Sequence, residues 1–302
     1  MFGTQPLALP WYLLPALIVP GMALIAQTRL GNTAAIEKIV APFLDGSKDS
    51  LAKATASHLS GHLVFAELAE KTGTQHYKEL VRRAADLGFN SDDTLKESMP
   101  FHNEMSDSVF MGCPILAKAG KLTGEGKYFD MALRHFRYMA KLCRRDDGLY
   151  RHSPLHEAAW GRGNAFPALG LALTLADTPK NHPAFDEMLD SFRELMRALA
   201  RFQDQDTGMW RQVIDHRGAY PEFSATAMIA RSMLIGIRNG WIDENEFRPR
   251  VDAAWHAILA RVSDGGEVVD VCESTGKQDS LAKYLDRRAI LGRDARGGGM
   301  AM

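Results

Sequence analysis

The stretch Thr72-Gly73-Thr74-Gln75-His76-Tyr77 returns at residues 123–128 as Thr-Gly-Glu-Gly-Lys-Tyr, so that both copies share the pattern T-G-x-x-x-Y. An apolar segment precedes each copy, and an amphipathic segment with apolar residues at helical spacing follows it. A helix, a short glycine-containing turn and a second helix make a helical hairpin. This repeat therefore decides the fold class.

The same alternation continues along the chain and predicts four helical hairpins. Their paired helices are expected in residues 59–69 and 77–87, 109–119 and 128–142, 163–176 and 185–202, and 224–237 and 247–262. The first helix of each pair is poor in charge and the second carries charged residues on one face, so the first helices should be inner and the second outer. Strand-like alternation is confined to short runs such as residues 267–271, which favours an all-α fold.

Polar, aromatic and glycine-rich connectors precede the predicted inner helices at residues 101–104, 152–164, 210–222 and 272–293. All of them would lie at the same end of the hairpins. An open solenoid spreads its binding residues along a concave face, whereas this clustering favours a closed α/α ring with a binding site at one mouth.

Composition excludes several classes of function. The chain has 302 residues, is 46% hydrophobic and 24% charged, and has a formal net charge of -1. It offers no positive excess for a nucleic-acid backbone, so no nucleic-acid partner is expected. Three scattered cysteines, Cys113, Cys143 and Cys272, are too few for a disulfide framework and are interpreted as buried thiols in a reducing compartment. A cytoplasmic location is expected.

The first thirty residues form an apolar segment, because residues 7–26 are almost wholly apolar and are interrupted by Pro10, Pro15 and Pro20. No lysine or arginine precedes this run, so the charged start of a secretory signal is missing, although export to the periplasm or membrane anchoring stays an alternative. We treat residues 1–30 as a separate segment that the binding site can dispense with. Residues 31–302 are expected to form a single catalytic domain.

The first chemically distinctive cluster is residues 102–111, a polar run that turns directly into an apolar helix. His102 and Asn103 in this run are candidate substrate-binding residues. A carboxyl group placed beside Val109 and other apolar side chains would be partly removed from water, and desolvation favours the protonated form of a carboxyl. Asp107 is therefore a candidate acid/base residue. The alternative is that Ser106 or Asp107 simply caps the helix.

The second cluster is residues 152–166, which hold two histidines, an acid, an arginine, an amide and two aromatic rings. These are the groups that a site for an anionic sugar needs, and the candidate substrate-binding residues here are His152, Trp160, Arg162, Asn164 and Phe166. A purely structural loop is the alternative. His152 and His156 have helical spacing, but Pro154 lies between them and no third ligand is apparent, so no metal site is expected.

The third cluster, residues 207–226, adds Trp210, Gln212 and Ser224 as candidate substrate-binding residues. A tryptophan with amide and hydroxyl groups nearby is a usual platform for a sugar ring. The alternative is a core tryptophan beneath a turn.

Taken in order, these segments resemble the unsaturated uronyl hydrolases of glycoside hydrolase families 88 and 105, from about residue 57 to the C-terminus. The most specific similarities are residues 107–114 with 119–120 and 123–124, residues 160–164 and residues 208–215. Further similarities lie at residues 222–228, 240–241, 271–272 and 275–276.

The resemblance implies an (α/α)6 barrel in which Asp107 is the general acid/base and His152 and Arg162 hold the substrate near the cleaved bond. It implies hydration of the C4–C5 double bond of a 4,5-unsaturated glucuronic or galacturonic acid at the non-reducing end of an oligosaccharide. Neither a metal nor an organic cofactor is implied.

The chain departs from the family pattern at two positions: a second aspartate is replaced near His58, and a tryptophan is replaced by Phe166. The first fifty residues do not resemble the family's first hairpin and the last inner helix would only be starting at Met302, so the barrel is expected to be incomplete at its seam. Two other functions stay open. One is a non-catalytic carbohydrate-binding protein of this fold, and the other is a sugar isomerase or epimerase that uses His102, His152 and His156 as proton shuttles.

Overall fold

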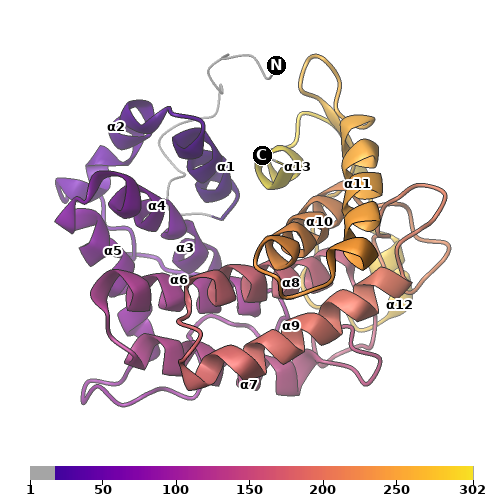
Figure 1. Cartoon of the computed structure of the whole chain (residues 1–302). Coiled ribbons are helices and arrows are strands. Elements are labelled where there is room, and N and C mark those ends of the chain that lie inside the picture. Colours follow the sequence, from indigo (N-terminus) through magenta and orange to yellow (C-terminus); the bar gives the residue numbers. More distant parts are fainter. Residues whose placement is uncertain (1–17, 302) are drawn as a thin grey trace.

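In the computed structural model, residues 18–301 are described, and most of them are helical (Figure 1). The helices form a ring of inner helices surrounded by outer helices, which is the α/α toroid predicted from the hairpin repeat. The three cysteines are buried and unpaired, as expected.

The inner ring consists of helices that each contact the next one in the circle. In order they are α1 (Ile18–Arg29), α3 (Ala56–Gly61) continued by α4 (Leu63–Thr72), α6 (Ser108–Thr123), α8 (Gly161–Asp177), α10 (Phe223–Arg238) and α13 (Ala295–Ala301). Helix α13 contacts both α10 and α1, so the first and last described helices close the ring.

The outer helices pack against the inner ring and turn their charged faces outward. They are α2 (Thr33–Leu44), α5 (Gln75–Ala85), α7 (Lys127–Cys143), α9 (Pro183–Arg201) and α11 (Glu244–Leu259). Helix α8 is buried on nearly all sides, whereas α9 buries only one face. This contrast confirms the prediction of inner and outer helices from their charge content, and all four predicted hairpins are present.

The T-G-x-x-x-Y repeat marks the same turn in two hairpins. Gly73 and Gly124 end α4 and α6 with φ angles of 72° and 78°, the left-handed conformation that glycine adopts without steric cost. The tyrosines of the pattern, Tyr77 and Tyr128, lie in the first turn of the outer helices and are buried. Each copy thus ends an inner helix, reverses the chain and anchors the outer helix in the core.

The position of helix α1 corrects the prediction that residues 1–30 form a segment separate from the barrel. It contacts α3, α4 and α13 as the first inner helix, and its residues Leu24, Ile25 and Thr28 are buried. Arg29 at its end forms a two-pronged ion pair with Glu67 of α4, with nitrogen–oxygen distances of 3.0 and 2.7 Å. The rest of the predicted segment, residues 1–17, lies outside the described residues.

None of the helices within residues 18–301 is long and apolar enough to cross a membrane.

After α11, residues 268–292 form a small two-stranded sheet with a short helix, which we call the C-terminal excursion. Strand β1 (Val268–Cys272) pairs antiparallel with β2 (Ala289–Gly292), and the short helix α12 (Leu281–Leu285) lies between them in sequence. The strand-like run near residue 267 was correctly identified. The inner ring itself is closed at the seam, where α13 contacts α1.

Candidate active site

Asp107 occupies the N-cap position of α6, yet its side chain forms no capping hydrogen bond. Its Oδ2 instead lies 2.9 Å from Nε2 of His152. Its Oδ1 is buried and has no hydrogen-bond partner within the described part of the chain. The alternative that the Asp107 side chain caps the helix is therefore wrong, and one of its carboxyl oxygens has no protein partner.

The start of α6 is fixed against α8 by contacts next to Asp107. Ser106 donates from Oγ to the carbonyl oxygen of Gly163 over 2.6 Å, and its backbone N–H donates to the carbonyl of His152 over 2.9 Å. The approach at Gly163 is close, because an added Cβ there would lie 3.1 Å from Ser106 Oγ and 3.4 Å from the His152 ring. Asp107 and His152 are thus held by backbone and side-chain contacts from two inner helices.

His152 is fully buried between three aromatic or acidic partners. Its Nε2 faces Asp107, its Nδ1 lies 3.1 Å from the hydroxyl of Tyr284, and its ring centre lies 4.6 Å from that of Trp160. Tyr284 comes from α12, which connects the small sheet. His152 therefore links Asp107 to a residue of the C-terminal excursion.

Arg162, in the first turn of α8, is buried in contacts with the protein. Its guanidinium lies over the Trp160 ring, 4.8 Å from the ring centre, and Nη1 donates to the carbonyl of Cys272 over 2.8 Å and to Ser224 Oγ over 3.3 Å. The same nitrogen lies 3.6 Å from Oε1 of Glu222. Arg162 thus packs on Trp160, and the Trp160 ring lies beside His152, which contacts Asp107. Asp107, His152 and Arg162 therefore belong to one cluster that also contains Trp160.

Glu222 compensates the buried charge of Arg162. The carboxylate is fully buried and accepts hydrogen bonds from Ser224 Oγ and from the backbone N–H groups of Ala225 and Cys272. It caps α10 and attaches the end of β1 to the ring at the same time. A buried ion pair with this many hydrogen bonds fixes local geometry more than it adds stability.

Several predicted substrate-binding residues are structural. Trp210 is fully buried and donates from Nε1 to the carbonyl of Leu199, so no ring face is open to a sugar and the core alternative holds. Asn164 is buried and bonds both backbone groups of Tyr150. Phe166 packs on Phe110 with 5.6 Å between ring centres.

Gln212 and Ser224 are also buried, but both contact the site's framework. Gln212 donates from Nε2 to the backbone carbonyl of Tyr284 over 2.8 Å, and its Oε1 is buried without a partner among the described residues. Ser224 bridges Arg162 and Glu222. These two side chains hold the elements that surround His152.

His102 and Asn103 lie on the loop before α6, at the rim of the site. Phe101, Asn103 and Glu104 have φ angles of 66°, 49° and 54°, which are uncommon for residues other than glycine. Nδ1 of His102 accepts from the backbone N–H of Glu104 over 3.0 Å, and Glu104 pairs with Lys277 of the C-terminal excursion over 3.0 Å. The excursion therefore contacts the loop that leads to Asp107.

The departure at His58 lies in α3, next to α6. Nδ1 of His58 is 2.7 Å from Thr55 Oγ1, and burial lowers the pKa of His58. Helix α3 contacts α6 through Ser60, whose Oγ lies 3.1 Å from Met111 Sδ. A histidine thus stands near the ring position at which the family resemblance expects an acid.

Sequence reasoning missed Tyr284 and the role of Glu222. Glu222 was noticed only as part of a similar segment, and its position two residues before Ser224 at a helix start was the available signal. Tyr284 gave no local signal, because its partner His152 is 132 positions away.

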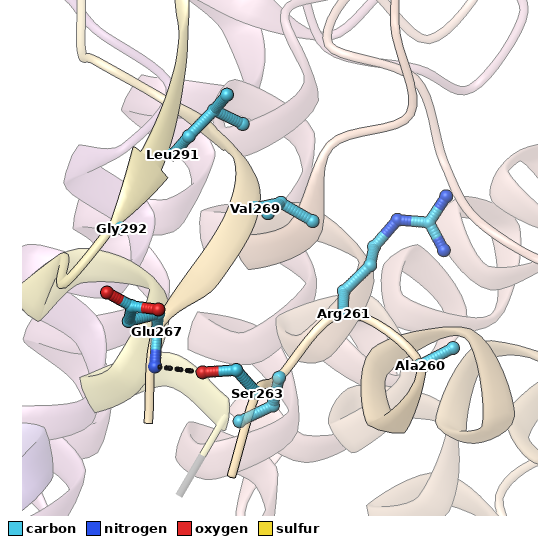
Figure 2. A pocket seen from close by; sticks show the side chains of 8 residues that line it. Ala260, Arg261, Ser263, Glu267, Val269, Leu291 and Gly292 are labelled. Carbon is cyan, nitrogen blue, oxygen red and sulfur yellow. Dashed lines mark hydrogen bonds between the residues drawn. The ribbon is translucent and has the colours of Figure 1, made fainter. Parts of the chain in front are cut away.

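Figure 2 shows a pocket between the end of α11 and the two-stranded sheet, where the Glu267 backbone N–H donates to Ser263 Oγ over 3.0 Å. None of the residues that line this pocket is a predicted site residue. Across residues 18–301, no group of three or more His, Cys, Asp or Glu side chains is placed to hold a metal ion.

Comparison with solved structures agrees with the toroid. A family 105 glycoside hydrolase of C. acetobutylicum ATCC 824 superposes with a TM-score of 0.79 and 21% identity, covering 96% of this chain and 93% of that one. The unsaturated glucuronyl hydrolase of Bacillus sp. GL1 gives a TM-score of 0.63 and 15% identity, covering 93% and 82%. At these identities the likeness shows the fold alone.

Curated relatives and a family model extend the comparison to sequence. An unsaturated 3S-rhamnoglycuronyl hydrolase of Alteromonas sp. (strain LOR) is 25% identical over 260 residues, which are 76% of this chain and 62% of the relative. The unsaturated rhamnogalacturonyl hydrolase YesR of Bacillus subtilis (strain 168) is 27% identical over 187 residues, which are 59% and 52%. The chain thus spans less than two thirds of either relative. A model of Glycosyl Hydrolase Family 88 matches residues 16–302, and the chain belongs to this family.

Proposed function

We propose that this chain removes a terminal 4,5-unsaturated uronic acid from an oligosaccharide by hydrating the C4–C5 double bond. The observation that carries the proposal is the buried Asp107–His152 pair, which leaves Oδ1 of Asp107 without a protein partner at the start of an inner helix. Relatives named as unsaturated rhamnoglycuronyl and rhamnogalacturonyl hydrolases support the choice of substrate class.

The proposed reaction uses one carboxyl group twice. Protonated Asp107 transfers its proton to C4 of the alkene, and positive charge develops at C5 beside the ring oxygen. Water adds to C5 while the Asp107 carboxylate takes one of its protons, which restores the acid. The resulting hemiketal opens at the ring oxygen, and the hemiacetal formed at C1 expels the aglycone. No carboxylate attacks the anomeric carbon, so the usual two-carboxylate scheme is not needed.

The surrounding residues take supporting roles in this proposal. His152 holds Oδ2 of Asp107 and directs Oδ1 toward the alkene, and Trp160, kept in place by Arg162, borders the same space. His102 and Asn103 lie at the more open rim, where the aglycone would leave the site. The completely buried Trp210 and Asn164 take no part in binding.

The test is the variant Asp107→Asn, assayed by the loss of absorbance of the unsaturated uronate in a disaccharide. An amide keeps the size of the side chain but cannot give a proton to the alkene, so turnover should fall by about 10²–10⁴-fold, the usual contribution of a general acid/base. The unfolding temperature should change little, because the native side chain forms no capping bond.

Asp93→Asn is the matched control, since Asp93 is an exposed acid paired with Lys127 away from the site. It should retain full turnover. Near-normal loss of absorbance by Asp107→Asn would reject Asp107 as the acid. A wild-type chain that binds the disaccharide without bleaching it would point to the non-catalytic alternative.

A further inference from the structure

His152 has two hydrogen-bond partners, and the placement of its protons decides how it can act on Asp107. The ring is completely buried, so solvent supplies neither a donor nor an acceptor. Nε2 lies 2.9 Å from Asp107 Oδ2, and Nδ1 lies 3.1 Å from the Tyr284 hydroxyl. The protonation of each nitrogen must therefore follow from what these two partners can donate or accept.

The Tyr284 hydroxyl has a proton to donate, and His152 Nδ1 lies within reach as an acceptor. Tyr284 is fully buried, and burial raises its pKa, so the hydroxyl stays protonated. Its oxygen accepts from the backbone N–H of Gln278 over 3.3 Å. Two groups beside this hydroxyl can accept its proton, His152 Nδ1 and the side chain of Ser153.

The opposite arrangement fits the contact with Asp107 less well. If Nδ1 carried the proton, it would donate to a tyrosine oxygen that already accepts from Gln278, and the tyrosine O–H would turn to Ser153. Nε2 would then present a lone pair to Asp107 Oδ2, so an ionised Asp107 would lose a buried donor and a protonated Asp107 would give its proton to His152 instead of the alkene. Two buried acceptors that face each other without a hydrogen between them lose their hydration without compensation.

We infer that Tyr284 is a positioning residue that acts on Asp107 through His152. Its hydroxyl donates to Nδ1, fixes His152 as the neutral Nε2–H tautomer, and so aims an N–H donor at Oδ2 of Asp107. Oδ1 then remains the oxygen that carries the transferred proton. This inference rests on the proposed function for its catalytic consequence, although the tautomer itself is independent of the substrate.

The position of Tyr284 is itself defined by the C-terminal excursion. Its backbone carbonyl accepts from Gln212 Nε2 over 2.8 Å, which attaches α12 to the connector before α10. The pair formed by Lys277 and Glu104 attaches the same excursion to the loop before Asp107. The excursion between β1 and β2 therefore supplies a residue that completes the proton geometry of the site.

The experiment is nitrogen-15 NMR of the histidine side chains in the full chain at neutral pH, with the His152 signals assigned by comparison with His152→Gln. The wild-type protein should show His152 as the Nε2–H tautomer. Tyr284→Phe keeps the ring but removes the donated proton, so the His152 signals should move toward the Nδ1–H or doubly protonated pattern. In the disaccharide assay kcat should fall by about 10–100-fold, the scale seen when the partner that orients a functional histidine is lost, while KM should change less than kcat.

Tyr128→Phe is the matched control, because Tyr128 is also buried and its hydroxyl donates to Asp86 over 2.7 Å on another part of the ring. It should leave both the His152 signals and kcat unchanged. A wild-type spectrum with Nδ1–H or doubly protonated His152, or one that Tyr284→Phe does not change, would overturn the inference even if the variant folds poorly. Inactivity of the wild-type chain together with the expected spectra would instead reject the proposed function and leave the positioning role intact.

Discussion

Two histidines away from the site, His62 and His135, are buried as neutral rings. His135 accepts from the backbone N–H of Met99 at Nδ1 and lies 2.9 Å from the carbonyl of Ser108 at Nε2. His62 spans the carbonyl of His58 and the hydroxyl of Ser50. Burial lowers the pKa of each from 6.5 to about 4. In each of the two histidines one ring nitrogen acts as a hydrogen-bond acceptor, and protonation of the ring would remove that acceptor.

These two residues predict a loss of stability in mild acid. Between their unfolded value of 6.5 and about 4, the unfolded chain binds more protons than the folded chain, so the free energy of unfolding falls as pH is lowered through this window. Above pH 6.5 the stability that depends on the neutral rings is fully present. Denaturant midpoints measured across it should decrease, and His62→Gln should show a smaller decrease than the wild type. A midpoint that does not vary over this range would contradict the prediction.

Individual residues also show which parts of the candidate site could be predicted from the sequence and which could not. Asp107, Trp160 and Arg162 were singled out because each stands at or beside the start of an inner helix, and His152 because it lies in the connector before α8. Trp210 lies in the same kind of connector, but it points into the core and bonds the end of α9. Local sequence does not specify to which side of a connector a side chain turns, since packing of distant helices decides it.

At the scale of elements, the crossing of α6 and α8 brings the two halves of the site together. It depends on Gly170, where an added Cβ would lie 2.8 Å from the backbone of Phe110. Backbone atoms cannot turn away as the end of a flexible side chain can. The helices themselves were predictable from period and charge, but this close approach was not, because it is a property of two helices together.

Gly170→Ala should therefore reduce the free energy of unfolding by about 1–3 kcal/mol, as overpacking of a core does. Gly298→Ala is the matched control, because Gly298 is also helical, in α13, and an added Cβ there meets no atom within 4 Å. It should be neutral or stabilise by up to about 1 kcal/mol through helix propensity. Equal effects of the two substitutions in chemical denaturation would show that the crossing tolerates the methyl group.

For the whole molecule, ring closure depends on α1, which the sequence did not connect to the barrel. The apolar run at residues 7–26, which Pro10, Pro15 and Pro20 interrupt, hid the helical period on which the other assignments rested. The role of α1 appears only when α13 is placed beside it. The closed inner ring and the family match beginning at residue 16 both include this helix.

Ile25→Ala tests whether α1 is an integral part of the ring. Ile25 is 8% exposed in the core, so its truncation should lower the free energy of unfolding by about 2–5 kcal/mol. Leu30, one residue beyond the helix and 70% exposed, provides the control, and Leu30→Ala should have almost no effect. If both variants unfold at the wild-type denaturant concentration, the ring does not need α1.

The contact between α1 and α13 also sets an order of events during synthesis. Residues 18–29 leave the ribosome early, and their partners at residues 295–301 follow only after nearly all of the described chain has been made. At ordinary elongation rates this interval is on the order of tens of seconds. For that time α1 has an uncovered apolar flank, and contacts so distant in sequence form slowly even afterwards. We expect the nascent chain to expose this flank to chaperones that bind apolar segments until α13 arrives and closes the ring.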